Sequence, residues 1–304
     1  MTKLAFILHA RDKVKHVRAA CRSMLLQDSP RPIEIIFSDQ GSTDGTLGIL
    51  EDEARRYGGP HAVHVVRCPH VDLRGMGGLN AHITWSMGQT DADFILQLSA
   101  DDYALPRRAI LTWEAFEAHK PSMVLTGMYY VREADGAYEG ESAWPDASVG
   151  DSWCKLEEMF SKYVGGSASQ AWTHEFFDKI GGLDGLGSQD VVMPFLACLD
   201  KGAWYIYERL HAYRRCVGVE NTGLQSVLEA HPKGSPEHLQ VEELIHFQVL
   251  TGLYDTLAKM DAAGLRTPEA EALLAQNILD RAAGWNAARV RLSLRQIPPL
   301  SFKT

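Results

Sequence analysis

The stretch EIIFSDQGSTDGT, residues 34–46, joins an apolar segment of strand length to a glycine-containing turn and the start of a helix. Its continuous apolar first half is typical of a parallel strand that is buried on both faces. Gly41 lets the chain turn, and Ser42 or Thr43 can cap the helix that follows. The stretch therefore predicts a strand–turn–helix unit that delivers Asp39 to the carboxyl end of a buried strand.

Similar units precede and follow this stretch. Strands are predicted at residues 3–8, 33–38, 62–67 and 94–98, and helices at 13–26, 43–57 and 80–87. This βαβαβαβ order predicts a mostly parallel α/β sheet with helices on both faces. Ligands of such sheets bind at the carboxyl ends of the strands. The segments expected there are His9–Arg11, Asp39–Thr43, Cys68–Arg74 and Ser99–Asp102.

The second half of the chain changes character. A helix is predicted over residues 106–120 and strands over 123–130 and 203–207, with a long polar loop at 132–151. Beyond about residue 221 the sequence turns helical. Ser235-Pro236 and Thr267-Pro268 are helix starts, with a hydroxyl residue at the N-cap and proline at the first helical position.

Composition limits the classes of function. The chain has 304 residues, 45% of them hydrophobic, and a net charge of −9. This charge argues against a broad electrostatic grip on nucleic acid or an anionic membrane. No apolar run is long enough to span a membrane, and the five cysteines are scattered. We therefore expect a soluble, cytoplasmic protein with reduced thiols, in which the first apolar run is a strand and not a signal peptide.

Two carboxylates end the fourth predicted strand, in the stretch FILQLSADD, residues 94–102. Adjacent carboxylates repel each other unless a cation lies nearby. A hard divalent ion prefers oxygen ligands and can bridge a carboxylate and a diphosphate. Asp101 and Asp102 are therefore candidates for a metal site, and the alternative is that they cap a helix that begins near Pro106.

The stretch at residues 34–46 resembles the hallmark of the inverting family 2 glycosyltransferases, which have the GT-A fold. That family has an apolar strand followed by Asp-Asp-Gly-Ser-Thr-Asp-Gly-Thr, and only Gln40 departs from it. The segment Ser23-Met24-Leu25-Leu26-Gln27 resembles the family's Ser-Leu-Leu-x-Gln. The resemblance implies a nucleotide-sugar donor, with Asp39 reading its base, usually uracil. The alternative is an aspartate that only caps a strand–turn–helix connection.

The acidic stretch resembles the family's Asp-x-Asp-Asp motif, with Ser99 at the first position. The resemblance implies that Asp101 binds Mn²⁺ or Mg²⁺ and that Asp102 assists. Other donor-binding candidates lie at neighbouring strand ends and in the Gly-rich stretch 74–81, which resembles the family's Ala-Arg-Asn segment. They are His9, Ala10, Arg11, Arg74, Asn80, Ser99, Ala100 and Asp102. For His9 the alternative is that it merely finishes a strand, and for Arg74 that it is a solvated loop residue.

The stretch KIGGLDGLGSQD, residues 179–190, resembles the family's Gly-Gly-Phe-Asp-Glu segment and the Glu-Asp that follows it. The family places its general base at the final aspartate, here Asp190, whose alternative role is a helix N-cap. Further on, Arg214 and Arg215 are candidates for phosphate contacts. The family's metal-binding histidine has no clear counterpart, because Cys216 stands there, and His211 is a substitute candidate.

The resemblance covers roughly residues 3–215. We expect a GT-A domain at 1–220, with donor binding in about 1–105 and the acceptor and catalytic part in about 106–220, and a helical extension at 221–304. The extension is a candidate for shaping the acceptor site or for a homo-oligomer interface. The acceptor is open among a saccharide, a lipid-linked sugar, a protein and a hydroxylated DNA base, so nucleic acid enters only as an acceptor.

Two other functions compete with this interpretation. A nucleotidyltransferase would also use a metal and a doubly wound sheet, but its first loop should be glycine-rich, and residues 9–12 contain no glycine. A non-catalytic nucleotide-sugar-binding module is favoured by Ser99, Gln40 and Gln189, which depart from the family's motifs.

Overall fold

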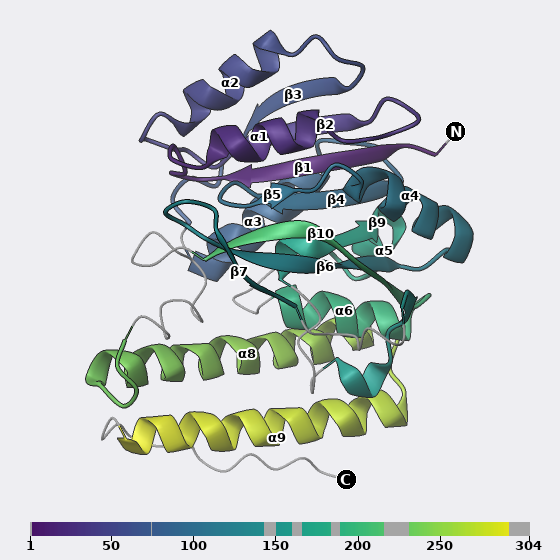
Figure 1. Cartoon of the computed structure of the whole chain (residues 1–304). Helices are drawn as coiled ribbons and strands as arrows, with labels where there is room; N and C mark the ends of the chain where they lie inside the picture. The colour runs from purple at the N-terminus through teal and green to yellow at the C-terminus, as the bar shows by residue number, and fades with distance from the viewer. Residues whose placement is uncertain are drawn as a thin grey trace.

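The computed structural model describes residues 2–73, 75–142, 150–159, 166–183, 189–215 and 231–291. Within these ranges the chain forms a ten-stranded sheet with helices on both faces. Two long antiparallel helices lie beyond one of these helical layers, at the bottom of the view in Figure 1.

The first four strands form the parallel half of the sheet, in the order β3-β2-β1-β4. They are β1 (Leu4–Ala10), β2 (Glu34–Asp39), β3 (Ala62–Arg67) and β4 (Phe94–Ser99). The helices that connect them are α1 (Val17–Leu25), α2 (Thr46–Arg56) and α3 (Gly75–Met87). The predicted βαβαβαβ order is confirmed. Strand β1 ends two residues later than predicted, and the bounds of the other three strands differ from the prediction by at most one residue.

The second half of the sheet mixes directions. A short strand, β9 (Gln170–Thr173), runs antiparallel to both β4 and β6 (Met123–Arg132), and β10 (Ala203–Arg215) then pairs with β6 in parallel. The remaining strands are β5 (Tyr103–Ala104) and β8 (Ser152–Trp153), which pair with β10, and β7 (Tyr138–Glu141), which pairs with β6. The four short strands were not predicted, because two to four residues are too few to show a period.

The other helices divide between the two faces. They are α4 (Arg108–His119), η1 (Leu156–Glu158), η2 (Ser167–Ser169), α5 (His174–Lys179), α6 (Gln189–Leu199), α8 (Pro236–Ala262) and α9 (Pro268–Arg291). Residues of α1 and α4 share one apolar core with the sheet, and residues of α3, α5 and α6 share the other. Helices α8 and α9 pack against each other, and α8 packs against α6. Their predicted starts are confirmed, since Ser235 and Thr267 accept hydrogen bonds from the first turns.

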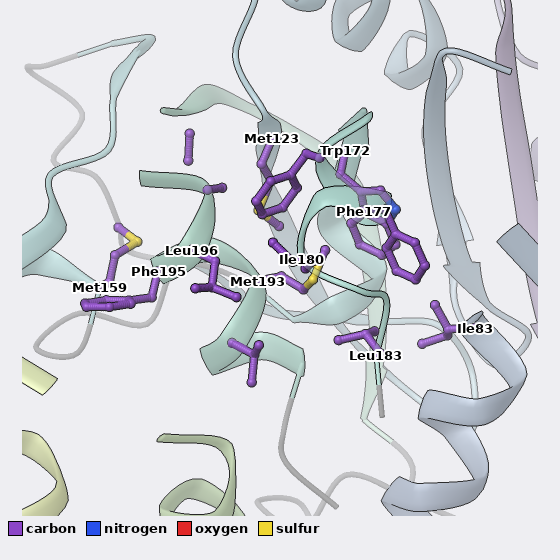
Figure 2. Packing of buried hydrophobic residues seen from close by; sticks show 14 of the residues in the cluster. Ile83, Met123, Met159, Trp172, Phe177, Ile180, Leu183, Met193, Phe195 and Leu196 are labelled. Carbon is purple, nitrogen blue, oxygen red and sulfur yellow. The ribbon is translucent and has the colours of Figure 1, made fainter. Parts of the chain in front are cut away.

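The core on the α5 and α6 side is dense and aromatic. The rings of Trp172 and Phe177 stack with their centroids 5.9 Å apart, and Leu183 and Ile83 lie near them in Figure 2. The same apolar cluster continues into α8 and α9. The expected division at residues 220 and 221 falls outside the described residues and stays a prediction, but the C-terminal helices share a core with the sheet domain.

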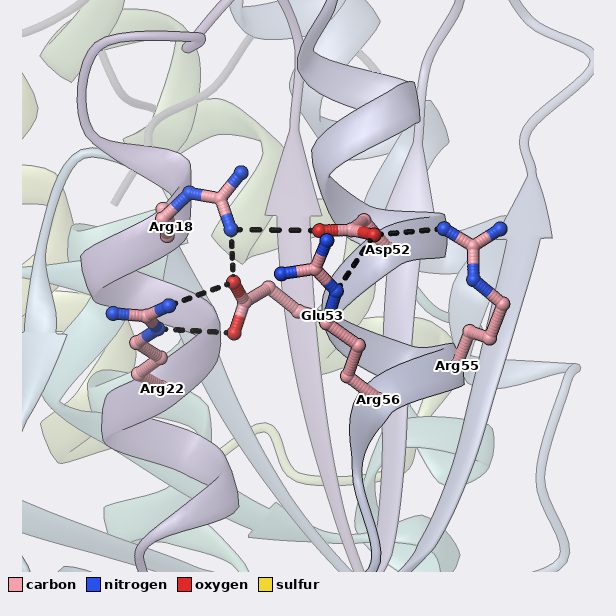
Figure 3. Close-up of polar contacts among 6 residues, drawn as sticks. All are labelled: Arg18, Arg22, Asp52, Glu53, Arg55 and Arg56. Atoms are coloured by element: carbon pink, nitrogen blue, oxygen red, sulfur yellow. Dashed lines mark hydrogen bonds and ion pairs between the residues drawn. The ribbon is translucent and has the colours of Figure 1, made fainter.

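An ion-pair cluster fastens α1 to α2. Glu53 in α2, only 6% exposed, is bound by Arg18 and Arg22 from α1, with Arg22 Nε 3.0 Å from Glu53 Oε2. Its neighbour Asp52 pairs with Arg55 and Arg56 of its own helix (Figure 3). The cluster fixes the helix that follows the first strand against the helix that follows the second.

Candidate active site

The ends of the parallel strands are joined by backbone hydrogen bonds. The amide of Gln40 donates to the carbonyl of Ala10 at 2.9 Å, and the amide of Ala100 donates to the carbonyl of His9 at 3.1 Å. In the sheet register Ala10 lies opposite Asp39. The structure therefore brings the predicted segments after β1, β2 and β4 to one edge of the sheet.

Asp39 has one oxygen occupied and one without a partner. Its Oδ2 accepts hydrogen bonds from the amides of Gly41 and Ser42, both at 3.0 Å. Its Oδ1 is buried and makes no hydrogen bond within the described part of the chain. Gly41 has φ +70°, and a Cβ there would lie 2.6 Å from a side-chain atom of Val71, so the tight turn needs glycine. A buried acceptor without a donor is costly, and a bound ligand's N–H can relieve that cost.

Gln40 explains one departure from the family's motif. Its Nε2 donates to two backbone carbonyls, those of His70 and Gly78, each at 2.9 Å. A carboxylate at this position has no hydrogen to donate. The glutamine therefore holds the segment after β3 and the first turn of α3 against the end of β2.

The other polar residues of the turn form hydrogen bonds with the loop that follows β1. The hydroxyl of Ser42 accepts from the amide of Asp12 at 2.9 Å, and the carboxylate of Asp12 accepts from the amide of Thr43 at 2.7 Å. The hydroxyl of Thr46 accepts from the amide of Lys13, also at 2.7 Å. The polar side chains of the turn thus fix the backbone of residues 12 and 13.

These contacts correct one expectation about the turn. Neither Ser42 nor Thr43 caps the helix, because α2 begins at Thr46 and its N-cap residue, Gly45, makes no side-chain cap. The amide of Thr46 is bonded instead by the carboxylate of Asp44 at 2.9 Å. The hydroxyl of Ser42 and the backbone of Thr43 are engaged by the neighbouring loop.

Asp101 is paired with a lysine that sequence reasoning did not single out. Its Oδ2 lies 2.9 Å from the Nζ of Lys13, and the two side chains are only 12% and 14% exposed. The sequence does place a lysine three residues after the end of β1. That this lysine meets Asp101 becomes apparent only from the pairing of β1 with β4. The repulsion between the adjacent carboxylates is thus relieved in part by a cation of this chain.

Asp102 points into the protein. Its Oδ1 accepts from the amide of Arg214 at 2.7 Å, and its Oδ2 lies 3.2 Å from the Nε2 of His211. Burial raises the pKa of Asp102 well above its usual range, and the Asp101 carboxylate raises it further. Burial also lowers the pKa of the nearby Arg108 guanidinium to about 9, a shift that the charge of Asp102 opposes. Asp102 therefore joins the acidic stretch to β10 in the interior of the protein.

The side chains at this edge provide only part of a ligand set for a divalent metal ion. Within the described ranges there is no group of three or more His, Cys, Asp or Glu side chains that could hold a metal. His211 is fully buried beside Asp102, and burial lowers its pKa well below the usual value. Asp101 offers a hard oxygen at the sheet edge. Mg²⁺ is commonly held by one or two carboxylates together with substrate phosphates, so the residues suit a metal that arrives with a diphosphate.

Arg214, near the end of β10, forms hydrogen bonds with the acidic stretch. Besides the bond from its amide to Asp102, its Nε donates to the backbone carbonyl of Asp101 at 2.8 Å. The guanidinium of its neighbour Arg215 lies over the ring of Tyr130, 4.5 Å from the centroid. Arg214 therefore contacts the acidic stretch directly, whereas Arg215 lies against β6.

The other predicted residues near β1 bind protein groups. The Nε2 of His9 lies 2.8 Å from the Oγ of Ser86 in α3, and its ring meets His82 edge-to-face at 5.0 Å. Arg11 donates to the backbone carbonyls of Val71 and Leu73. Asn80 is buried in α3, Ser99 ends β4, and Arg74 lies outside the described residues.

The Ser-Met-Leu-Leu-Gln segment anchors the chain that follows the acidic motif. The Oγ of Ser23 accepts from the amide of Ala104 at 3.1 Å, and the Oε1 of Gln27 accepts from the amide of Ala109 at 2.9 Å. The Nε2 of Gln27 donates to the carbonyl of Leu105, also at 2.9 Å. These contacts fix the direction in which the chain leaves Asp101.

Asp190 lies half-buried in the first turn of α6. Residues 184–188, which precede this helix in the predicted motif, lie outside the described residues. Just before them, Leu183 donates its amide to the hydroxyl of Thr84 in α3 at 3.0 Å, and that hydroxyl donates to the carbonyl of Leu183 at 2.6 Å. The Gly-Gly-Leu turn is therefore bonded to α3.

The parallel β3-β2-β1-β4 half, the mixed second half and the acidic stretch at the end of β4 define a GT-A glycosyltransferase fold. The family model described as Glycosyl transferase family 2 matches residues 7–177, more than half of the chain. The chain therefore belongs to glycosyl transferase family 2, a nucleotide-sugar-dependent family, and is a glycosyltransferase.

Solved structures share this fold at low sequence identity. Residues 1–349 of TarS from S. aureus in complex with UDP-GlcNAc match with a TM-score of 0.58 and 14% identity, over 96% of this chain and 84% of TarS 1–349. The same protein in complex with UDP matches with a TM-score of 0.56 and 16% identity, over 95% and 92%. The mannosyltransferase PcManGT from Pyrobaculum calidifontis, in complex with GDP-Man and Mn²⁺, matches with a TM-score of 0.52 and 17% identity, over 96% and 83%.

The similarity to these structures extends into the C-terminal helices. Coverage of 96% of this chain is too high for α8 and α9 to lie wholly outside the matched part.

No curated protein matches the chain by sequence. Among the described helices, none combines the length and the apolar character needed to cross a membrane.

Proposed function

We propose that this enzyme transfers a sugar from a UDP-linked donor to a hydroxyl acceptor, with inversion at the anomeric carbon. The observation that carries the proposal is the buried Oδ1 of Asp39, an acceptor without a hydrogen-bond donor in the described residues, on the same sheet edge as Asp101. The structures of TarS with UDP and with UDP-GlcNAc support a uracil nucleotide, and PcManGT with GDP-Man supports a nucleoside diphosphate more broadly.

Asp39 is proposed to read the base. Uracil carries a single ring N–H beside two carbonyls, and this N–H can donate to Oδ1. The two backbone amides on Oδ2 keep the carboxylate oriented while the base binds. This supports recognition of the base by a preorganised acceptor, which costs little entropy on binding. Arg11 supports the same edge, because its guanidinium donates to the backbone carbonyls of Val71 and Leu73 in the loop before α3. Asn80 is proposed to contact the donor from α3.

Asp101 is proposed to face the diphosphate, together with Ser99, Ala100 and the arginines at the end of β10. Mn²⁺ or Mg²⁺ held by Asp101 and the diphosphate would neutralise charge on the leaving nucleotide. The carboxylate is kept at the edge by the bond from Arg214 Nε to its backbone carbonyl. Asp102 supports this arrangement through its bond with the backbone of Arg214.

Asp190 is proposed as the general base. An acceptor hydroxyl is a poor nucleophile at neutral pH, and its proton must be removed as it attacks the anomeric carbon. The carboxylate at the first turn of α6 is half-buried and follows the Gly-Gly-Leu turn that α3 holds. A saccharide acceptor is favoured over a hydroxylated DNA base, because a net charge of −9 opposes a duplex.

The test is a panel of nucleotide sugars, including UDP-, GDP- and CMP-linked donors, incubated with Mn²⁺ and monitored for release of the nucleotide. We expect slow hydrolysis of a UDP-sugar by the wild type and none by Asp101→Asn, with the melting temperature retained. Failure of the wild type to bind or cleave any of these donors would refute the proposal.

A second candidate is a binding module that kept the fold and lost turnover. Ser99 in place of the first motif aspartate favours it, as does Gln189 in place of glutamate. Gln40 no longer counts in its favour, because its two backbone contacts give it a structural role. Binding of a UDP-sugar without hydrolysis or transfer to any acceptor would identify the module.

A further inference from the structure

The pair formed by Lys13 and Asp101 places two cations in competition. The Nζ of Lys13 lies 2.9 Å from Oδ2 of the carboxylate that the proposed function assigns to a divalent ion. A divalent ion that binds this oxygen competes with the ammonium group, because both cations are attracted to the same carboxylate and repel each other at this distance. Both side chains are largely buried, so water screens their attraction only partly.

The loop that carries Lys13 is fixed on both sides of it. The amide of Lys13 donates to Thr46 Oγ1 at 2.7 Å, and the amide of Val14 donates to Asp44 Oδ2 at 2.9 Å. The backbone is thus held while the side chain of four methylene groups can rotate. A lysine on such an anchor can exchange one anionic partner for another without moving the loop.

We propose that Lys13 is a charge-exchange residue. It neutralises Asp101 before the donor binds, leaves that carboxylate when the divalent ion arrives with the nucleotide, and then binds the donor's diphosphate. The inference rests on the proposed function, since it takes the diphosphate to lie at Asp101. It adds a phosphate contact from the first strand–helix loop, and it explains why the metal and the nucleotide should bind together.

Two opposite effects of one substitution test the inference. Lys13→Met keeps the apolar stem and removes the charge, so free Mn²⁺, titrated without nucleotide, should bind about tenfold more tightly than to the wild type. In saturating Mn²⁺ the same variant should bind UDP about tenfold more weakly, because a charge-assisted hydrogen bond is lost. Lys13→Arg should restore much of the UDP affinity.

Two controls separate this exchange from a general disturbance of the loop. Lys15→Met removes an exposed lysine of the same loop and should change neither affinity. In an Asp101→Asn background, Lys13→Met should no longer raise the affinity for free Mn²⁺, because the shared oxygen has lost its charge. Melting temperatures measured in parallel show whether each variant is folded.

The outcomes are distinguishable. If the wild type binds UDP and Lys13→Met changes neither affinity, or weakens both, the charge exchange is refuted and the proposed function stands. If the wild type binds no UDP with Mn²⁺ present, the proposed function fails and the inference fails with it. Only the crossed result, with tighter free Mn²⁺ and weaker UDP, supports the exchange.

Discussion

The amide of Lys13 donates a 2.7 Å hydrogen bond to the hydroxyl of Thr46, and this bond joins the loop after the first strand to the first residue of α2. Thr46 is fully buried, and its hydroxyl also donates to the carboxylate of Asp44 at 2.6 Å. Thr46, the last residue of the stretch at 34–46, therefore holds the loop that follows β1. Through that loop it places the Lys13 ammonium group against Asp101.

Thr46→Val should show this coupling. The substitution keeps the shape and removes the hydroxyl, so the partly buried amide of Lys13 loses its partner. We expect a loss of about 1–3 kcal/mol in the free energy of unfolding. UDP affinity in Mn²⁺, measured by calorimetry, should also fall. Thr251→Val is the matched control, because that hydroxyl bonds within α8, to the carbonyl of Phe247. Equal effects of the two variants on UDP affinity would argue against a role for the loop.

Asp39→Asn should separate base recognition from phosphate binding. The amide oxygen can still accept from Gly41 and Ser42, but the amide nitrogen then stands where Oδ1 was and offers a hydrogen to the ring N–H of uracil. We expect UDP to lose about 1–3 kcal/mol of binding free energy, while pyrophosphate is unaffected. Calorimetric titrations of both ligands make the comparison. Equal losses for UDP and pyrophosphate would mean that Asp39 shapes the whole site and does not read the base.

Much of the parallel half of the fold could be predicted from the sequence. Its strands are continuous apolar runs, so their periodicity and order predict the sheet, and the strand ends predict which edge carries Asp39 and Asp101. The short strand β9 could not be predicted, because its pairing between β4 and β6 depends on contacts across 45 or more residues of sequence. The sequence predicts Arg214 as a candidate for phosphate contacts, but its bond to the backbone of the acidic stretch emerges only from the structure of β10.

The polar contacts of the site were the least predictable part. Serine, threonine and aspartate in a turn have many local partners available, and the nearest helix end was the natural one to expect for Ser42. In the folded chain a neighbouring loop supplies the partner, so the hydroxyl bonds to Asp12. Lys13 was not identified for the same reason, since its partner lies 88 residues away in sequence and meets it only through the pairing of β1 with β4.

Asp190→Asn tests the general base. Asparagine keeps the shape and the hydrogen-bonding capacity of the side chain but cannot accept a proton from the acceptor. We expect donor and metal affinity close to wild type and a loss of at least about a hundredfold in the rate of transfer. Single-turnover transfer and the melting temperature are the two readouts. A helix-capping role predicts the reverse, because asparagine is an adequate cap and transfer would then be nearly unchanged.

The buried histidines predict an acid-sensitive fold. Burial lowers the pKa of His82 to about 4, and its Nε2 lies 2.7 Å from the Oγ of Ser38. The neutral form is favoured in the folded state, so the stabilisation is complete above the unfolded pKa of about 6.5 and is lost as the pH falls toward 4. The loss attributable to His82 is about 3 kcal/mol at pH 4.

Chemical denaturation at a series of pH values measures this loss. His82→Gln should flatten the fall in unfolding free energy between pH 6.5 and 4. Burial lowers the pKa of His9 as well, so part of the slope should remain in the variant. An unchanged slope in His82→Gln would show that this histidine is not the group that titrates.

The most direct test of the whole account is a crystal structure of the enzyme with UDP and Mn²⁺. The account predicts uracil with its ring N–H on Oδ1 of Asp39, the ion between Asp101 and the diphosphate, and the Nζ of Lys13 on a phosphate oxygen. UDP bound away from the ends of β1, β2 and β4, or a diphosphate that contacts neither Asp101 nor Lys13, would contradict it.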